Sequence, residues 1–199
     1  YFNDEINEVA FREAAEKVCK LARISFIRHG DKKYPNGFWA GADIFCSLVD
    51  NIQESFGLTP IEAMASGLPV VVSDWDGYRD TVRDGIDGYT IPTLAPRKGI
   101  GNKLAYKYFS GQNNYGDYLA ATQQSISVNF DALSTALTRL IENPSLRFKM
   151  GSAGRERAIS TYNWPKIIST LNLVFIIKFT GFIKHHLVKN INAINLRMK

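Results

Sequence analysis

The sequence is poor in the residues that build disulfide frameworks and many metal sites. Its 199 residues include two cysteines, Cys19 and Cys46, and three histidines. The two cysteines have neither a metal-type nor a redox-type spacing. We expect both to be buried, free thiols in a protein of the reducing cytoplasm.

Long apolar runs and a secretory leader are also missing from the sequence. The chain starts with the polar, acidic stretch YFNDE and without Met, so we expect a fragment or a processed product. With 45% hydrophobic and 22% charged residues, the composition is that of a soluble globular protein with a sizeable core.

Acidic residues are absent from the C-terminal tail, residues 166–199, which carries six lysines and arginines. The rest of the chain is therefore close to neutral, which argues against nucleic-acid binding by the main domain. Apolar residues recur at helical spacing in the tail, but Lys178 interrupts them before they could span a bilayer. We expect a basic amphipathic helix that docks on protein, with peripheral contact of residues 170–199 at the inner face of a membrane as the alternative.

The pattern of the first 94 residues predicts an α/β fold. Residues 4–22 have a helical apolar stripe, whereas 24–28, 42–49, 68–74 and 87–92 read as strands. The run Pro69–Val72 is typical of a strand that is covered on both faces of a parallel sheet. We predict a Rossmann-like, doubly wound parallel sheet that is truncated at its N-terminal side, because the chain begins on a helix.

The second half adds an insertion and further helices. The polar, tyrosine-containing stretch at about 95–128 is predicted to be a partly helical insertion, with its four tyrosines as packing residues. Residues 129–164 predict two helices joined at Asn143-Pro144, with Asp131 near the start of the first. This divides the chain into a domain at 1–165 and a tail at 166–199.

One short segment, ESFGLTPIE at 54–62, combines carboxylates with a helix start. Thr59, Pro60 and Glu62 fit a capping box, in which Glu62 caps its own helix, and Gly67 fits the C-terminal cap. Spacing alone leaves open whether Glu62 caps the helix or binds a ligand.

The stretch before this helix is more suggestive of a binding site. Glu54-Ser55-Phe56-Gly57 follows the second predicted strand, at the carboxyl edge of the sheet where α/β folds bind ligands. Gly57 permits close backbone approach, and the following amides point toward an anion such as a phosphate. The combination favours a ligand site.

Residues 38–92 resemble the donor-binding C-terminal domain of GT-B retaining glycosyltransferases, the glycosyltransferases group 1. Glu54 and Glu62 match the family's E-x7-E motif, and residues 62–72 match its "EAMA-G-PVV" stretch. Asp84-Gly85 and Gly88 match its "dG--G" turn. The segment 143–151 and Trp164 also match, so the resemblance covers about 20–94 and 129–165.

The resemblance implies a role for each site residue. Glu54 is the catalytic-site carboxylate that holds the hydroxyls of the donor sugar, and Glu62 holds the ribose of the nucleotide. The backbone of Ser55, Phe56, Gly57 and Leu58 meets the diphosphate of a nucleoside diphosphate sugar. His29, in the loop 28–33 near the nucleobase, is a wall or stacking residue or has a purely structural role.

The resemblance also implies what the chain would lack. The family's diphosphate-neutralising Arg and Lys, and its acceptor-binding N-terminal domain, would lie before Tyr1. We therefore expect a donor-binding domain that by itself is catalytically silent. No cofactor or metal is expected, because Asp74-Trp75-Asp76 fits the D-x-D metal signature only formally.

The predicted reaction is retaining transfer of a hexose to an acceptor hydroxyl. The sequence leaves two alternatives open. One is a related sugar-nucleotide epimerase or phosphorylase, and the other is a non-catalytic module that binds a partner or a membrane through the tail.

Overall fold

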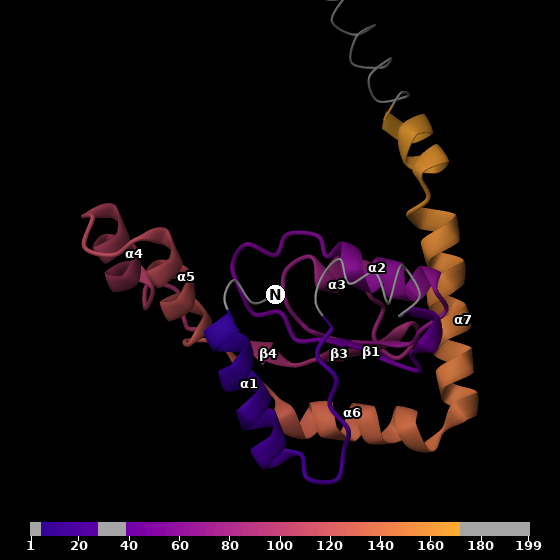
Figure 1. Cartoon of the computed structure of the whole chain (residues 1–199). Coiled ribbons are helices and arrows are strands. Elements are labelled where there is room, and N and C mark those ends of the chain that lie inside the picture. Colours follow the sequence, from indigo (N-terminus) through magenta and orange to yellow (C-terminus); the bar gives the residue numbers. More distant parts are fainter. Residues whose placement is uncertain (1–4, 28–38, 172–199) are drawn as a thin grey trace, which may run out of the picture. The chain divides into compact units, whose positions relative to one another are not determined.

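The computed structural model describes residues 5–27 and 39–171, the side chains of 5–7 excepted (Figure 1). The chain divides into two compact units, residues 1–41 and 42–199. The predicted His29 loop and most of the basic tail lie outside the described residues. Within the described part, no helix is both long and apolar enough to cross a membrane.

The first unit is built on helix α1 (Glu5–Val18) and a short 3-10 helix, η1 (Trp39–Gly41). The Arg12 guanidinium pairs with Glu8 one turn earlier and lies 4.6 Å from the ring centre of Phe26. Helix α1 ends four residues before the predicted end. Val18 and Leu21 are exposed, so burial does not stabilise another helical turn there.

The predicted strand at 24–28 does not form over its described residues, 24–27. A strand needs a neighbour to satisfy its backbone amides, and no described strand pairs with this segment. The prediction for the cysteines was half wrong. Cys19 and Cys46 are free thiols, but both are exposed, because Cys19 follows the end of α1 and Cys46 lies on an edge strand.

A parallel sheet forms the centre of the second unit. Its described strands are β1 (Phe45–Ser47), β2 (Val70–Ser73) and β3 (Gly88–Ile91), in the order β1-β2-β3. The register pairs Phe45 with Val70 and Val70 with Gly88. The parallel α/β prediction is confirmed, although each strand is shorter than the pattern suggested.

Helices cover both faces of this sheet. Every residue of β2 is fully buried, and its side chains alternate between the two faces. Figure 1 shows α2 (Leu58–Ala65) on one side of the sheet and α6 (Phe130–Glu142) on the other. On the α6 side, a core of Val71, Ile91, Ala136, Leu140 and Met150 forms. The short helix α3 (Tyr78–Thr81) contacts α2.

Two asparagines start the helices that follow the insertion. The Asn129 side chain accepts a hydrogen bond from the Ala132 amide at 2.9 Å, and α6 follows with Asp131 in its first turn. Asn143 accepts from the Leu146 amide at 2.9 Å at the start of α7 (Pro144–Thr161). The predicted helix pair and its Asn143-Pro144 junction are confirmed. Helix α7 packs mainly on α2, and a further helical stretch begins at residue 164.

The insertion is a helical hairpin with a small sheet at its base. Strands β4 (Thr93–Leu94) and β5 (Ser127–Val128) pair antiparallel and bring the two ends of the insertion together. Between them lie α4 (Asn102–Phe109) and α5 (Tyr115–Gln123). The rings of Tyr108, Tyr115 and Tyr118 pack against one another, as predicted. Tyr106 is instead 67% exposed.

Candidate functional site

The loop that leads from β1 to Glu54 is held by Asn51. The side-chain oxygen of Asn51 accepts hydrogen bonds from the amides of Gln53 at 2.8 Å and Glu54 at 3.1 Å. Its carbonyl accepts from the indole nitrogen of Trp75 at 2.8 Å. These bonds fix the backbone direction just before Glu54 by tying it to Trp75, two residues after β2.

Gly57 has a conformation and an environment that only glycine tolerates. Its φ of 75° is in the left-handed region, and the residue is buried. The ring of Tyr78 occupies the space where a side chain at position 57 would lie. The Tyr78 hydroxyl shares a 3.0 Å hydrogen bond with Ser47 at the end of β1, and the ring is 1% exposed.

A second glycine presses on the same loop from the other side. A Cβ atom at Gly77 would come within 2.5 Å of the Phe56 backbone nitrogen and Cα. Gly77 and Tyr78 together therefore clamp the backbone of residues 55–57. The shape of this loop is imposed by a neighbouring segment more than 20 residues later in the sequence.

Helix α2 begins at Leu58, directly after Gly57, and no described side chain caps its first amides. The predicted capping box was wrong. Thr59 lies inside the helix rather than at the N-cap, because the left-handed Gly57 starts the helix two residues earlier. Gly67, by contrast, ends α2 as predicted. It has a φ of 83°, and the Leu68 amide donates to the Ala63 carbonyl at 3.0 Å.

The two glutamates stand on either side of this helix start. Glu62 lies one turn into α2 and is exposed, and its carboxylate has no hydrogen-bond or ion-pair partner within residues 5–27 and 39–171. Glu54 is half-buried in the clamped loop, with one carboxylate oxygen 3.4 Å from the Phe56 amide nitrogen. That distance is longer than an ordinary hydrogen bond. Ser55, Phe56 and Leu58 are exposed around them.

The acids of Asp74-Trp75-Asp76 have local structural roles. The Asp74 carboxylate accepts from the Arg79 guanidinium at 2.7 Å, and Asp76 has a positive φ of 36° in the turn toward α3. Among the described residues, no group of three or more His, Cys, Asp or Glu side chains is placed to hold a metal ion.

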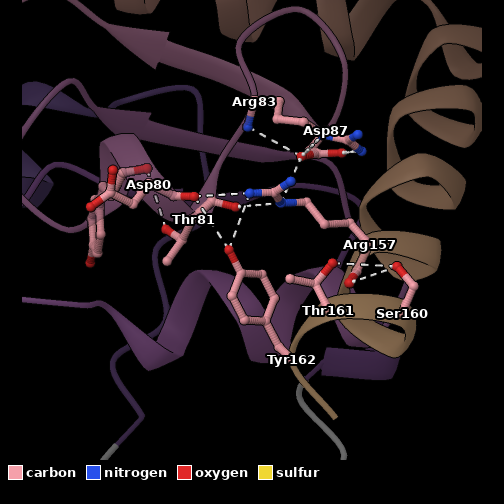
Figure 2. A network of polar contacts seen from close by, with 9 residues as sticks. Asp80, Thr81, Arg83, Asp87, Arg157, Ser160, Thr161 and Tyr162 are labelled. Carbon is pink, nitrogen blue, oxygen red and sulfur yellow. Dashed lines mark hydrogen bonds and ion pairs between the residues drawn. The ribbon is translucent and has the colours of Figure 1, made fainter. Parts of the chain in front are cut away.

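A fully buried carboxylate, Asp87, organises the region next to the site (Figure 2). It accepts from the Arg83 guanidinium at 2.6 and 3.0 Å and from the Arg83 amide at 3.1 Å. The hydrogen bond to Asp87 raises the pKa of Arg83 above its usual value. The Arg157 guanidinium of α7 lies 3.9 Å from the same carboxylate.

Arg157 connects this network to the Glu54 loop. It donates to the carbonyls of Asp80 at 2.9 Å and Thr81 at 3.2 Å, which end α3, and to the Tyr162 hydroxyl at 3.2 Å (Figure 2). The Tyr162 ring meets the Phe56 ring edge to face, with 6.0 Å between centroids. Tyr162, at the end of α7, thus supports the exposed side chain of Phe56.

A surface depression of about 180 Å³ lies over this network, lined by Arg83, Ala153, Glu156, Arg157, Ser160 and Thr161. Its two guanidinium groups are already engaged by Asp87 and by backbone carbonyls. Glu156 adds a negative charge at its edge, so the depression has a structural role and not a ligand-binding one. The candidate ligand site remains the start of α2.

Residues 6–98 match the family model described as "Glycosyl transferases group 1". Over these residues the chain is similar to the group 1 glycosyl transferases. The group 1 glycosyl transferase match includes Glu54, the clamped loop, α2 and β2. The resemblance expected from the motifs is therefore confirmed over residues 6–98.

Similarity to known mannosyltransferases extends beyond residues 6–98. The chain is 33% identical over 156 residues to the phosphatidyl-myo-inositol mannosyltransferase of Mycobacterium leprae. The matched region covers 78% of this chain and 32% of that enzyme. It is 24% identical over 136 residues to the MMP alpha-(1->4)-mannosyltransferase of Mycolicibacterium hassiacum, covering 68% of this chain and 25% of that enzyme. The chain thus spans about a third or less of the relatives that it matches.

The fold of a solved structure agrees with this assignment. The sucrose-phosphate synthase from Thermosynechococcus elongatus superposes with a TM-score of 0.60 and 22% identity, over 90% of this chain and 36% of that one. This similarity establishes the GT-B type of α/β fold.

Sequence reasoning missed the residues that support the site. Tyr78, Tyr162 and Asn51 contact the Glu54 loop from three different segments. The only local signal was Gly77 beside Tyr78, since glycine next to a large aromatic residue suggests a close backbone approach. Their contacts depend on the folded chain, so sequence separation conceals them.

Proposed function

We propose that this chain binds the nucleoside diphosphate sugar donor of a retaining glycosyl transfer to an acceptor hydroxyl. The observation that carries the proposal is the state of Glu62. Its carboxylate does not cap α2 and has no described partner, although it lies in the first turns of a helix that follows the clamped loop. An exposed acceptor of hydrogen bonds at this position is suited to the hydroxyls of a ribose.

The diphosphate would be bound by backbone amides between the two glutamates. The first amides of α2 have no described side-chain cap, and the helix dipole favours an anion there. The Phe56 amide is engaged only at 3.4 Å by Glu54, so a phosphate oxygen can replace that weak contact.

Glu54 is proposed to hold the donor sugar by its hydroxyls. The Asn51 bonds and the Gly77–Tyr78 clamp fix the backbone on either side of it, so its carboxylate can orient the sugar with little loss of entropy. As the bond from the anomeric carbon to the diphosphate breaks, negative charge grows on the leaving group. The amides and the helix dipole stabilise that charge, which lowers the barrier.

Donor binding can be tested on the 199-residue chain by ligand-observed NMR with uridine, guanosine and adenosine diphosphates and their hexose derivatives. Glu62→Gln should weaken binding of the preferred nucleoside diphosphate, and of its sugar derivative, by about 10- to 100-fold, the loss of a charge-assisted hydrogen bond. Glu54→Gln should weaken only the sugar derivative. Glu142→Gln, an exposed glutamate at the end of α6, is the control.

Small and equal effects of Glu54→Gln and Glu62→Gln would contradict these roles, as would failure of every nucleoside diphosphate to bind. Because the relatives are about three times as long as the matched region, we further propose that the 199 residues alone do not complete the transfer. Measurable sugar transfer by this polypeptide would contradict that part.

A further inference from the structure

We propose that the outer face of α4, with the loop before it, is a docking surface for an anionic phospholipid membrane. This surface, the α4 face, consists of Arg97, Lys98, Ile100, Lys103, Tyr106, Lys107 and Phe109. It lies in the insertion, away from the basic C-terminal tail in the sequence, and the proposal does not depend on the donor site.

The charge of the α4 face is of one sign. Residues 95–116 contain four basic residues and no Asp or Glu. Lys103 and Lys107 are exposed, and neither pairs with an acid in the described part of the chain. A cluster of cations without counter-charges is attracted to the negative potential of an anionic membrane surface.

Large apolar side chains are exposed beside these cations. Ile100 is 62% exposed, Tyr106 67% and Phe109 84%. Lys103, Tyr106 and Lys107 are three and four residues apart and so share one helix face, with Phe109 next to them. Lysines beside exposed aromatic rings are typical of helices that lie at the membrane interface.

The opposite face of α4 is occupied by the hairpin itself. Tyr108 packs on Tyr115 and Tyr118, with ring centroids 5.6 and 5.5 Å away. The α4 face therefore points away from the packed interior of the hairpin. Figure 1 shows α4 and α5 as a pair that joins the sheet at β4.

The chemistry of the α4 face favours lipid over two other partners. Cores of protein–protein interfaces are depleted in lysine, whereas this face has two lysines at its centre. Single-stranded nucleic acids bind in basic grooves, whereas this face is the convex side of a helix. Phe109 in particular has no polar group and would be inserted among acyl chains.

Docking here would also position the candidate site. Gln123 of α5 donates to Asp50 at 3.2 Å, and Gln53 donates to the Tyr115 hydroxyl at 3.0 Å. These two bonds tie the hairpin to the loop that runs into Glu54. A membrane bound to the α4 face would therefore lie at a set orientation to that loop.

The test is co-sedimentation of the full chain with phosphatidylcholine vesicles that contain or lack phosphatidylglycerol. Lys103→Gln with Lys107→Gln should lower the partition coefficient for the anionic vesicles on the order of 30-fold. Tyr106→Ser with Phe109→Ser should lower it at least tenfold, by removing buried apolar area. All variants keep the basic tail, so its contribution is constant.

The matched control is Phe148→Ser with Lys149→Gln, an exposed aromatic and basic pair on α7, which should leave partitioning within twofold. The proposal is overturned if both α4 variants bind the anionic vesicles like the control, or if phosphatidylglycerol makes no difference. Equal or tighter binding to a single-stranded oligonucleotide, lost with the lysines but not with the aromatic rings, would overturn it in favour of nucleic acid.

Discussion

The ring of Tyr78 lies against the backbone of Gly57, in the space that any side chain at position 57 would fill. The two residues belong to different segments, the loop after β1 and helix α3. Their contact sets the backbone from which α2 starts, and with it the position of the two glutamates of the candidate site.

Replacing Gly57 by alanine should be strongly destabilising. Alanine at a φ of 75° costs about 1–2 kcal/mol, and its methyl group would also displace the Tyr78 ring. We expect a loss of about 3 kcal/mol or more in the free energy of unfolding by urea. The control is Gly67→Ala, which has a similar φ of 83° but open space around the position, and should cost about 1–2 kcal/mol. Equal losses would show that Tyr78 does not constrain Gly57.

The hydroxyl of Tyr78 should stabilise the fold through Ser47. The two hydroxyls are 3.0 Å apart, and Tyr78 is almost completely buried. Tyr78→Phe and Ser47→Ala should each cost about 1 kcal/mol. A double-mutant cycle should give a coupling of about 1 kcal/mol, because either change removes the same bond. Additive losses would mean that the hydroxyls are satisfied separately.

The carboxylate of Asp87 should be among the most sensitive polar groups of the second unit. It is fully buried and accepts three hydrogen bonds from Arg83. Asp87→Ala should cost about 3 kcal/mol or more in the free energy of unfolding, as expected when a buried ion pair loses one partner. Asp74→Ala breaks the exposed pair with Arg79 and should cost less than about 1 kcal/mol. Similar values for both would contradict a structural role for Asp87.

A lysine at position 157 should not preserve the hydrogen bonds of Arg157. One guanidinium serves two carbonyls of α3 and the Tyr162 hydroxyl at once, which an ammonium group on a flexible stem cannot match. Arg157→Lys should cost about 1.5–3 kcal/mol and shift the ring resonances of Phe56, through the Tyr162 contact. Arg155→Lys, an exposed neighbour, should change neither. A loss of stability without a shift of the Phe56 resonances would show that the Arg157 network does not position the loop that carries Phe56.

The parallel sheet and its helices were predictable because their signals are local. The apolar run before Ser73 requires burial on both faces, and β2 is indeed fully buried. Asn143-Pro144 and Gly67 mark helix ends by backbone chemistry that depends on a few neighbours, and both predictions were confirmed. The resemblance to the group 1 glycosyl transferases, too, was recognisable, from the spacing of Glu54 and Glu62 in combination with the other motifs.

Other features depend on residues that are distant in the sequence. The pattern Thr59-x-x-Glu62 predicts a capping box, yet the helix starts at Leu58, because Tyr78 and Gly77 hold the preceding loop in another conformation. The apolar segment at 24–27 has the composition of a strand, but no described strand pairs with it, and backbone hydrogen bonds need that partner. Sequence alone thus determined the parallel sheet, its covering helices and the resemblance to the group 1 glycosyl transferases, whereas the tertiary contacts decided where α2 begins and that Glu62 does not cap it.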